Sequence, residues 1–261
     1  MSQQIEFHYP EGYSHGTIAT SEEGWSYSPS DSHFGVWIRE ARSICHDANF
    51  VRWCTSSVRS GSTIIDVGAN IGTHTCGYLE VAKAVISIEP FSTSFECLKR
   101  NVLKKIVTCH HNPCFYGICG AVGSDIGTLN LEVEPFNHGA SRIGPTGVTV
   151  QSLTLDTVGS VVPVRDVSLI KIDAEGYEGE ILSGSGASGP LAVWRGSERP
   201  NLVMEVNHGA LKAQGWSQDR LFAYLSQIRY FPTGCWPQEL DSMTYEQLKD
   251  VPQYDIHCAP A

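Results

Sequence analysis

Short runs of apolar, largely β-branched residues recur along this chain, and glycine or polar residues follow each of them. The five clearest runs are 63–67, 85–88, 115–122, 167–172 and 202–206. Such runs are typical of strands buried on both faces of a parallel sheet. Segments with helical spacing separate them, at about 73–82, 93–106, 177–183 and 217–228. The alternation predicts an α/β fold, with a doubly wound, mostly parallel, Rossmann-like sheet.

The remaining segments complete this prediction. Two strands near Tyr230 and Ile256 would make the sheet seven-stranded. Alternating apolar residues after the third run predict an inserted β-hairpin; they are Leu129, Leu131, Val133, Val148 and Val150. Residues 1–58 are expected to form an N-terminal helical cap or lid, and residues 59–261 a single compact domain. A glycine- and serine-rich loop is expected over 184–189.

Local signals predict where two helices begin. Asp31 or Ser32 is suited to cap a helix that carries Phe34, Trp37, Ile38 and Ala41 on one face. The spacing of Thr93 and Glu96 predicts a capping box. The aromatic residues of the N-terminal segment can form a wall over a ligand or belong to the core, and we favour the core. They are Trp25, Tyr27, Trp37 and Trp53.

Composition narrows the class of partner. Lys and Arg number 18 and Asp and Glu 28, which gives a net charge of −10, so a nucleic acid is disfavoured. No apolar run is long enough to cross a bilayer, and the N-terminus does not read as a signal peptide. Nine cysteines without a CxxC pair favour a reducing cytoplasm. The group Cys109, Cys114 and Cys119, with His110 and His111, fits no common zinc spacing. No metal is assigned.

The first strand end is Asp66-Val67-Gly68-Ala69-Asn70-Ile71-Gly72. Glycine lets the backbone approach a ligand closely, and the helix that follows offers unpaired N–H groups. Asn70 stands where a dinucleotide motif has its second glycine, and the Gly-Lys-Ser/Thr of a phosphate loop is missing. Glu89 ends the second run, where a carboxylate can accept hydrogen bonds from ribose hydroxyls. Together these features predict an adenosine-containing ligand.

The fourth strand end distinguishes between cofactors. Asp173 and Glu175 follow the run as two carboxylates separated by one residue. The sulfonium and ammonium groups of S-adenosylmethionine (SAM) are complemented by acidic groups, whereas a nicotinamide does not require them. The competing structural interpretation has one carboxylate capping the next helix and the other paired with Lys171.

With these segments in view, the chain resembles the FkbM family of SAM-dependent methyltransferases. The matching stretches occur in the order expected for that family, over about residues 60–210: Ile65–Gly72, Ile88–Pro90, Ala121–Gly123, Leu153–Asp156, Lys171–Leu182 and Leu202–Val206. The resemblance implies a class I methyltransferase fold and SAM as cofactor. It also implies methyl transfer to a hydroxyl of a sugar, a glycan or a polyketide-like small molecule.

The resemblance also implies roles for individual residues. Asp66, Gly68, Asn70 and Gly72 would surround the methionine part of SAM, and Glu89 the ribose. Phe91 or Val122 would pack against the adenine, and Asp173 would lie nearest the sulfonium.

The base that takes the acceptor's proton stays open. The candidates are Asp173, Glu175, His208 and His74, and Asp173 is the first choice by position. Oxygen ligands to a divalent metal from Asp173, Glu175 and Asn207 also stay open. The alternative functions are a nicotinamide-dependent oxidoreductase and a non-catalytic SAM-binding module. The acceptor and the oligomeric state, including a homo-oligomer, are not predicted.

Overall fold

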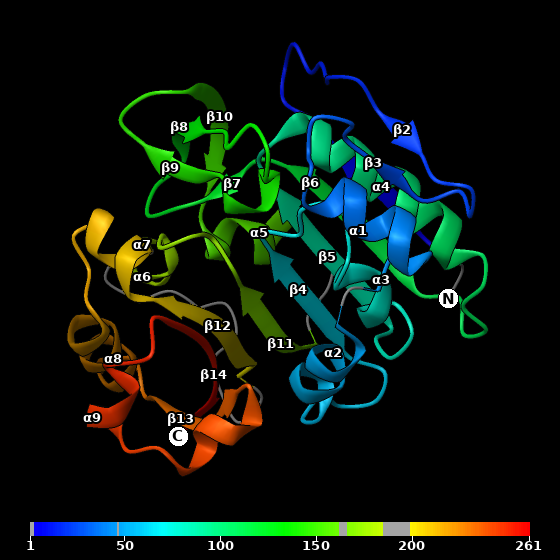
Figure 1. Cartoon of the computed structure of the whole chain (residues 1–261). Coiled ribbons are helices and arrows are strands. Elements are labelled where there is room, and N and C mark those ends of the chain that lie inside the picture. Colours follow the sequence, from blue (N-terminus) through cyan, green and yellow to red (C-terminus); the bar gives the residue numbers. More distant parts are fainter. Residues whose placement is uncertain (1–2, 46, 162–165, 185–198) are drawn as a thin grey trace.

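The fold is built on an eight-stranded sheet (Figure 1). The computed structural model describes residues 3–45, 47–161, 166–184 and 199–261; most of the loop expected over 184–189 therefore lies outside the described residues. The strands, in spatial order, are β1 (Ile5–His8), β6 (Cys114–Cys119), β5 (Ala84–Glu89), β4 (Thr63–Val67), β11 (Val167–Ile172), β12 (Asn201–Asn207), β14 (Gln253–Pro260) and β13 (Tyr230–Trp236). β14 pairs antiparallel with both of its neighbours, and the other pairings are parallel.

The doubly wound, mostly parallel α/β sheet is confirmed, and one strand was not predicted. Residues 5–8 pair in parallel with residues 115–118 of β6 and extend the edge of the sheet. The N-terminal segment is therefore not a purely helical cap, because it supplies this strand as well as two helices and the short strand pair β2 (Ala19–Thr20) and β3 (Ser26–Tyr27). The predicted boundary at residue 58 does not separate the cap from the sheet.

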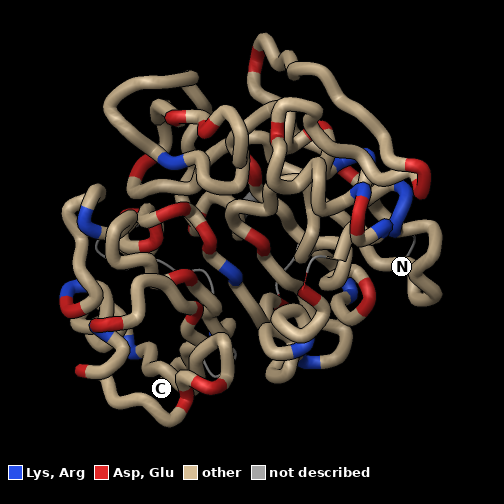
Figure 2. Tube along the Cα trace, viewed as in Figure 1, with Lys and Arg blue, Asp and Glu red and all other residues tan. Residues whose placement is uncertain are grey.

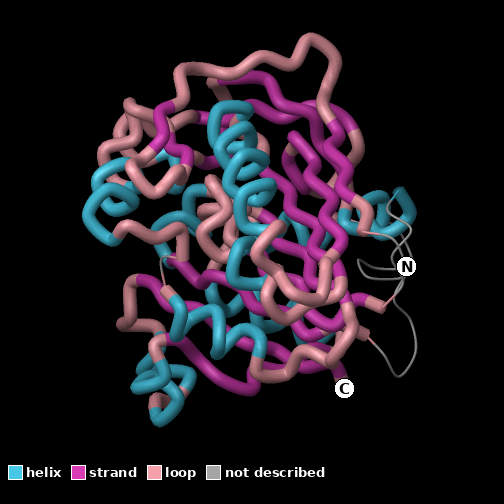
Figure 3. Tube along the Cα trace, turned by 90° about the vertical axis from the view of Figure 1, so that its right-hand side faces the viewer, coloured by secondary structure: helices cyan, strands magenta, loops and turns pink. Residues whose placement is uncertain are grey.

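Helices cover both faces of the sheet, because successive strand residues point to opposite sides. Ile64 and Leu169 face a core shared with α1 (Phe34–Ala41), α2 (Ala48–Thr55), α3 (Thr75–Tyr78) and α4 (Ser92–Ile106). Ile65 and Ile170 face a second core, shared with α5 (Leu155–Val161), α6 (Glu178–Ser183), α7 (His208–Ala213), α8 (Gln218–Gln227) and α9 (Tyr245–Leu248). Figure 3 shows the strands gathered together with helices packed around them.

The helix starts test the local predictions. Asp31 accepts hydrogen bonds from the backbone N–H groups of His33 and Phe34. The N-cap position of α1 is His33, however, and its side chain makes no capping bond. The capping box at Thr93 is wrong, because α4 begins one residue earlier and has no side-chain cap. The Thr93 hydroxyl instead accepts a hydrogen bond from the Gly16 N–H, which ties the N-terminal segment to α4. The helix predicted over 73–82 is reduced to the short α3.

The predicted insertion is confirmed and is larger than a hairpin. β8 (Gly127–Glu132) pairs antiparallel with β10 (Val148–Leu153), and β7 (Ala121–Val122) and β9 (Arg142–Gly144) extend the pair to four strands. Gly120 separates β6 from β7, so the third predicted strand is divided between the two sheets. The 3₁₀ helix η1 (His138–Ala140) lies between β8 and β9, and a second, η3 (Gln238–Ser242), follows β13. Figure 1 shows this small sheet above the central one.

The structure shows where the acidic residues lie and how the cysteines are used. Acidic residues are spread along the whole trace, including its interior (Figure 2). All nine cysteines are free. Within the described part of the chain, the helices are too short or too polar to cross a bilayer.

Candidate functional site

One pocket lies where the central strands end. Its volume is about 340 Å³, which is in the range of small-molecule sites. The walls come from residues that follow or end β4, β5, β11 and β12, and from the inserted sheet. The pocket therefore occupies the carboxyl edge of the parallel strands, the usual ligand position in this class of fold.

The turn after β4 forms one wall. Gly68 and Asn70 line the pocket with positive φ angles of 74° and 49°. A Cβ atom on Gly68 would lie 1.8 Å from the carbonyl oxygen of Asp173, so only glycine allows this close approach of the two strand ends. The side-chain oxygen of Asn70 is buried and has no hydrogen-bond partner among the described residues. It is therefore available to a ligand with a hydrogen-bond donor, such as an amino group.

Glu89 lies in the same pocket, at the end of β5. Its two carboxylate oxygens accept hydrogen bonds from the backbone N–H groups of Asn70 and Phe91, both at 2.8 Å. These bonds fix the carboxylate between the glycine turn and the start of α4. Burial raises the pKa of Glu89 to about 7, against the opposing effect of the two backbone donors.

The Lys171 side chain connects the carboxyl ends of β4 and β11. Its ammonium group lies 3.1 Å from Asp173 and 3.5 Å from Asp66, and it donates to the Gly68 carbonyl at 3.4 Å. Burial alone would lower the pKa of Lys171, but the carboxylates of Asp173 and Asp66 outweigh burial and raise it. The predicted pairing of Lys171 with one carboxylate of the pair is confirmed.

Three carboxylates converge beside this lysine. One oxygen each from Asp173, Glu175 and Glu205 can be chosen so that all lie within 4.8 Å of one another. Burial and the neighbouring carboxylates of Asp173 and Glu178 raise the pKa of Glu175 to about 8. Burial and the carboxylates of Asp173 and Glu175 raise the pKa of Glu205 to about 10. Ionising Glu175 and Glu205 at the floor of the pocket therefore requires more free energy than ionising an exposed glutamate.

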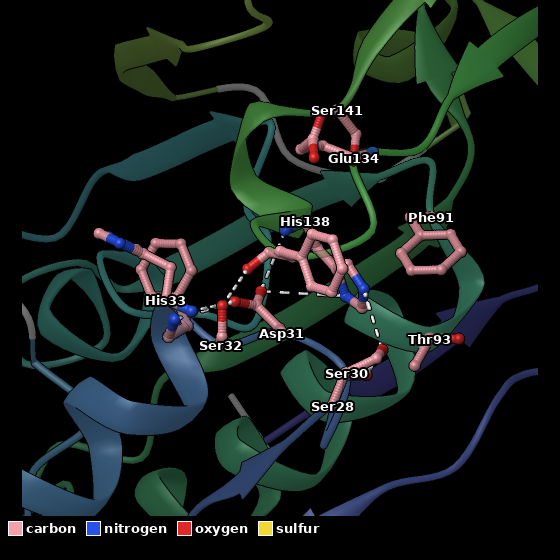
Figure 4. A network of polar contacts seen from close by, with 12 residues as sticks. Ser28, Ser30, Asp31, Ser32, His33, Phe91, Thr93, Glu134, His138 and Ser141 are labelled. Carbon is pink, nitrogen blue, oxygen red and sulfur yellow. Dashed lines mark hydrogen bonds and ion pairs between the residues drawn. The ribbon is translucent and has the colours of Figure 1, made fainter.

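The roof of the pocket joins two distant segments (Figure 4). His33 and Phe34 come from the start of α1, and Asn137 and His138 from the insertion; all four line the pocket. Asp31 links these two segments, because its second carboxylate oxygen accepts a hydrogen bond from the backbone N–H of His138 at 3.1 Å. Burial lowers the pKa of His138, although Asp31 acts in the opposite direction.

Several predicted site residues meet in this pocket: Gly68, Asn70, Glu89, Val122, Asp173, Glu175 and His74. Asp66 and Gly72 lie behind the wall instead. Asp66 accepts a hydrogen bond from the Thr75 hydroxyl at 2.6 Å, and a Cβ atom on Gly72 would lie 2.8 Å from Leu98. Both residues shape the turn without being among the residues that line the pocket.

Phe91 and His208 do not line the pocket either. The ring of Phe91 packs edge-on against His138, with centroids 4.9 Å apart, so Phe91 supports the roof from behind. His208 begins α7, and its ring packs against that of Tyr254.

Sequence reasoning missed Glu205 and the roof. Glu205 gave one signal, a carboxylate inside an otherwise apolar strand. The contact between the two segments of the roof gave none, because Asp31 and His138 are 107 residues apart and meet only through the fold. The N-terminal aromatic residues belong to the core, as favoured above, with Tyr27 buried and Trp25, Trp37 and Trp53 packed against it.

Comparison with known proteins identifies the family. The model of the methyltransferase FkbM domain matches residues 66–232, more than half of the chain. The chain belongs to the FkbM methyltransferase family. Membership brings the class I methyltransferase fold and makes SAM the expected cofactor. The cradle at Gly68 and the fixed Glu89 carboxylate fit a cationic nucleoside of this kind. So does the Asn70 oxygen, to which the described part of the chain offers no hydrogen-bond donor.

Individual relatives are more distant. A hexuronic acid methyltransferase, AglP, from Haloferax volcanii is 27% identical over 152 residues, which cover 57% of this chain and 59% of the relative. An FkbM methyltransferase from Methylobacillus flagellatus superposes with a TM-score of 0.47 at 15% identity, covering 86% of this chain and 52% of that one. A putative methyltransferase from Streptococcus mutans in complex with SAH gives a TM-score of 0.43 at 10% identity, with 81% and 96% covered.

Proposed function

We propose that this FkbM-family chain transfers a methyl group from SAM to a hydroxyl group of a sugar or glycan. The observation that carries the proposal is the single pocket that unites the glycine turn, Glu89 and the carboxylates after β11. The relative named a hexuronic acid methyltransferase supports a sugar as the acceptor class.

Different residues of the pocket would bind the cofactor and the acceptor. Gly68 and Asn70 would hold the methionine part of SAM and Glu89 the ribose, with Val122 against the adenine. SAM supplies an electrophilic methyl group and leaves as S-adenosylhomocysteine. The acceptor would lie between the roof around Asn137 and His138 and the carboxylate floor, which line the same pocket.

The reaction requires alignment and removal of one proton. The acceptor oxygen forms a bond to the methyl carbon as the carbon–sulfur bond breaks, and the hydroxyl proton passes to a base. Holding both partners in line can supply about 7–11 kcal/mol of the barrier reduction. Asp173 lines the pocket and is held by Lys171 at 3.1 Å. It is therefore placed to receive the proton, with Glu175 beside it.

The first experiment measures cofactor binding and then turnover. Calorimetry with S-adenosylhomocysteine should show saturable binding of one molecule per chain. Incubation with SAM and a set of hexuronic acid and hexose glycosides should release S-adenosylhomocysteine with at least one acceptor. Absence of any heat of binding would overturn the proposal.

Asp173→Asn tests the assignment of the base. We expect this variant to bind S-adenosylhomocysteine within about an order of magnitude of the unchanged protein. Its turnover should fall by about 10²–10⁴-fold, the usual contribution of a positioned base. Asp166→Asn is the matched control, because Asp166 precedes the other end of β11 and is also ion-paired, with Arg59 at 2.8 Å. Equal turnover in the two variants would remove Asp173 as the base.

A further inference from the structure

We infer that Asp173, Glu175 and Glu205 bind a divalent cation of the Mg²⁺ or Mn²⁺ class on the floor of the pocket. The three carboxylates come from the loop after β11 and from β12, and their nearest oxygens lie within 4.8 Å of one another. Carboxylate oxygens are the ligands that such hard cations prefer.

Glu205 gives the independent indication of a missing ligand. Glu205 is only 5% exposed, and it is one of the residues that line the pocket. One carboxylate oxygen accepts a hydrogen bond from Gln253, while the other is buried and has no partner in the described structure. A buried oxygen without a partner is costly in a folded protein, and a cation in the pocket would satisfy it.

The charge of the lining points the same way. Among the described lining residues, four are acidic, whereas Lys171 is the only lysine or arginine. Lys171 is already shared between Asp66 and Asp173. Its favourable effect on Glu175 is outweighed by burial and by the carboxylates of Asp173 and Glu178, so the pKa of Glu175 is still raised. A divalent cation beside Glu175 and Glu205 would allow both side chains to be ionised at the same time without moving the lysine.

The surroundings hold the carboxylates in place. Gln253 fixes Glu205 from the neighbouring strand β14. Glu178 accepts hydrogen bonds from the N–H groups of Ala174 and Gly176, on either side of Glu175. Outer interactions of this kind orient metal ligands. Asn207, considered as a ligand from the sequence, is engaged elsewhere, because its side-chain oxygen caps α7 at Ala210.

The role of the cation rests on the proposed methyl transfer, whereas its binding does not. A cation at this floor would hold the acceptor's hydroxyl oxygen and favour loss of its proton to a carboxylate of the same group. The acceptor class that fits is a sugar with neighbouring hydroxyl or carboxylate oxygens, which can chelate the ion.

The test is a Mn²⁺ titration of the chelator-treated full chain without SAM or acceptor, followed by electron paramagnetic resonance. We expect one tightly bound Mn²⁺ per chain. Glu205→Gln and Glu175→Gln should each weaken binding by at least about tenfold, as is usual when a metal site is disturbed. Glu205→Gln keeps the acceptor for Gln253, and an unchanged melting temperature shows that the variant folds.

Asp255→Asn is the matched control. Asp255 faces Glu205 across the β12–β14 pair but does not line the pocket. Asp255 acts on the site only through the electrostatic effect of its charge on Glu205 and Asp173, so Asp255→Asn should change Mn²⁺ affinity much less than the loss of a direct ligand. Absence of saturable binding, or equal losses in Asp255→Asn and Glu205→Gln, would overturn the cation site. Failure of S-adenosylhomocysteine binding with Mn²⁺ binding intact would instead overturn the proposed methyl transfer.

Discussion

Two residues other than glycine that line the pocket have a left-handed backbone conformation, which normally favours glycine. Asn70 and Glu175 have φ angles of 49° and 51°, and each follows the end of a central strand. Conformations of this kind cost free energy and persist where the surrounding structure imposes them. Here the imposed turns aim the Asn70 amide and the Glu175 carboxylate into one space.

Gly68→Ala tests how closely the two strand ends are packed. The new Cβ atom would meet the Asp173 carbonyl at 1.8 Å, and the backbone cannot yield there without separating β4 from β11. We expect the free energy of unfolding to fall by about 3 kcal/mol, measured by urea denaturation. S-adenosylhomocysteine binding should weaken as well.

Gly61→Ala is the control for backbone strain alone. Gly61 has a φ of 77°, close to the 74° of Gly68, but a Cβ atom there meets nothing within 4 Å. We expect a loss of about 1 kcal/mol. Equal losses in the two variants would show that the close approach at Gly68 contributes little.

At the scale of elements, the N-terminal segment and the insertion act together as the roof. The Asp31 carboxylate accepts hydrogen bonds from the backbone N–H groups of His33 and Phe34 through one oxygen and from the backbone N–H of His138 through the other. Ser32 and His33 also donate backbone hydrogen bonds to the Phe136 carbonyl. These bonds couple the start of α1 to η1, so we expect the two segments to open together.

Asp31→Ala should therefore lower the free energy of unfolding by more than the loss of an ordinary helix cap does. Asp47 caps α2 with the same two backbone bonds but forms no hydrogen bond with the insertion in the part of the chain that the structure describes, so Asp47→Ala should lower the free energy of unfolding by about 1 kcal/mol. Asp31→Ala should lower it by about 2–3 kcal/mol, because the buried His138 N–H also loses its acceptor. Hydrogen exchange should report faster opening of residues 136–141 in Asp31→Ala. Equal exchange in both variants would contradict the coupling.

At the scale of the whole molecule, the acidic chain places carboxylates inside the fold as well as on its surface. Burial raises the pKa of Glu178 to about 7, from 4.5, although backbone N–H groups oppose the shift. A carboxyl group whose pKa is raised on folding binds its proton more tightly in the folded state. Its stabilising contribution is present below pH 4.5 and is lost as the pH rises through 7.

The stability of the metal-free chain should accordingly fall between pH 5 and pH 8. Glu178→Gln removes one titrating group while keeping an acceptor for the Ala174 and Gly176 N–H groups. Relative to the unchanged chain, the variant should gain about 2 kcal/mol between pH 5 and pH 8. Chemical denaturation at both pH values measures this gain. Parallel pH profiles would show that Glu178 does not titrate in this range.

The sequence by itself determined the layered α/β fold, the glycine turn, Glu89 and the carboxylates after β11. These follow from local signals, because buried parallel strands require apolar runs and their carboxyl ends share one edge of the sheet. Only the tertiary structure decided that residues 5–8 join the sheet, that Glu205 faces the pocket, and that Asp31 meets His138. Edge pairing, side-chain direction and contacts between distant segments depend on how the elements pack, and no local pattern in the chain encodes them.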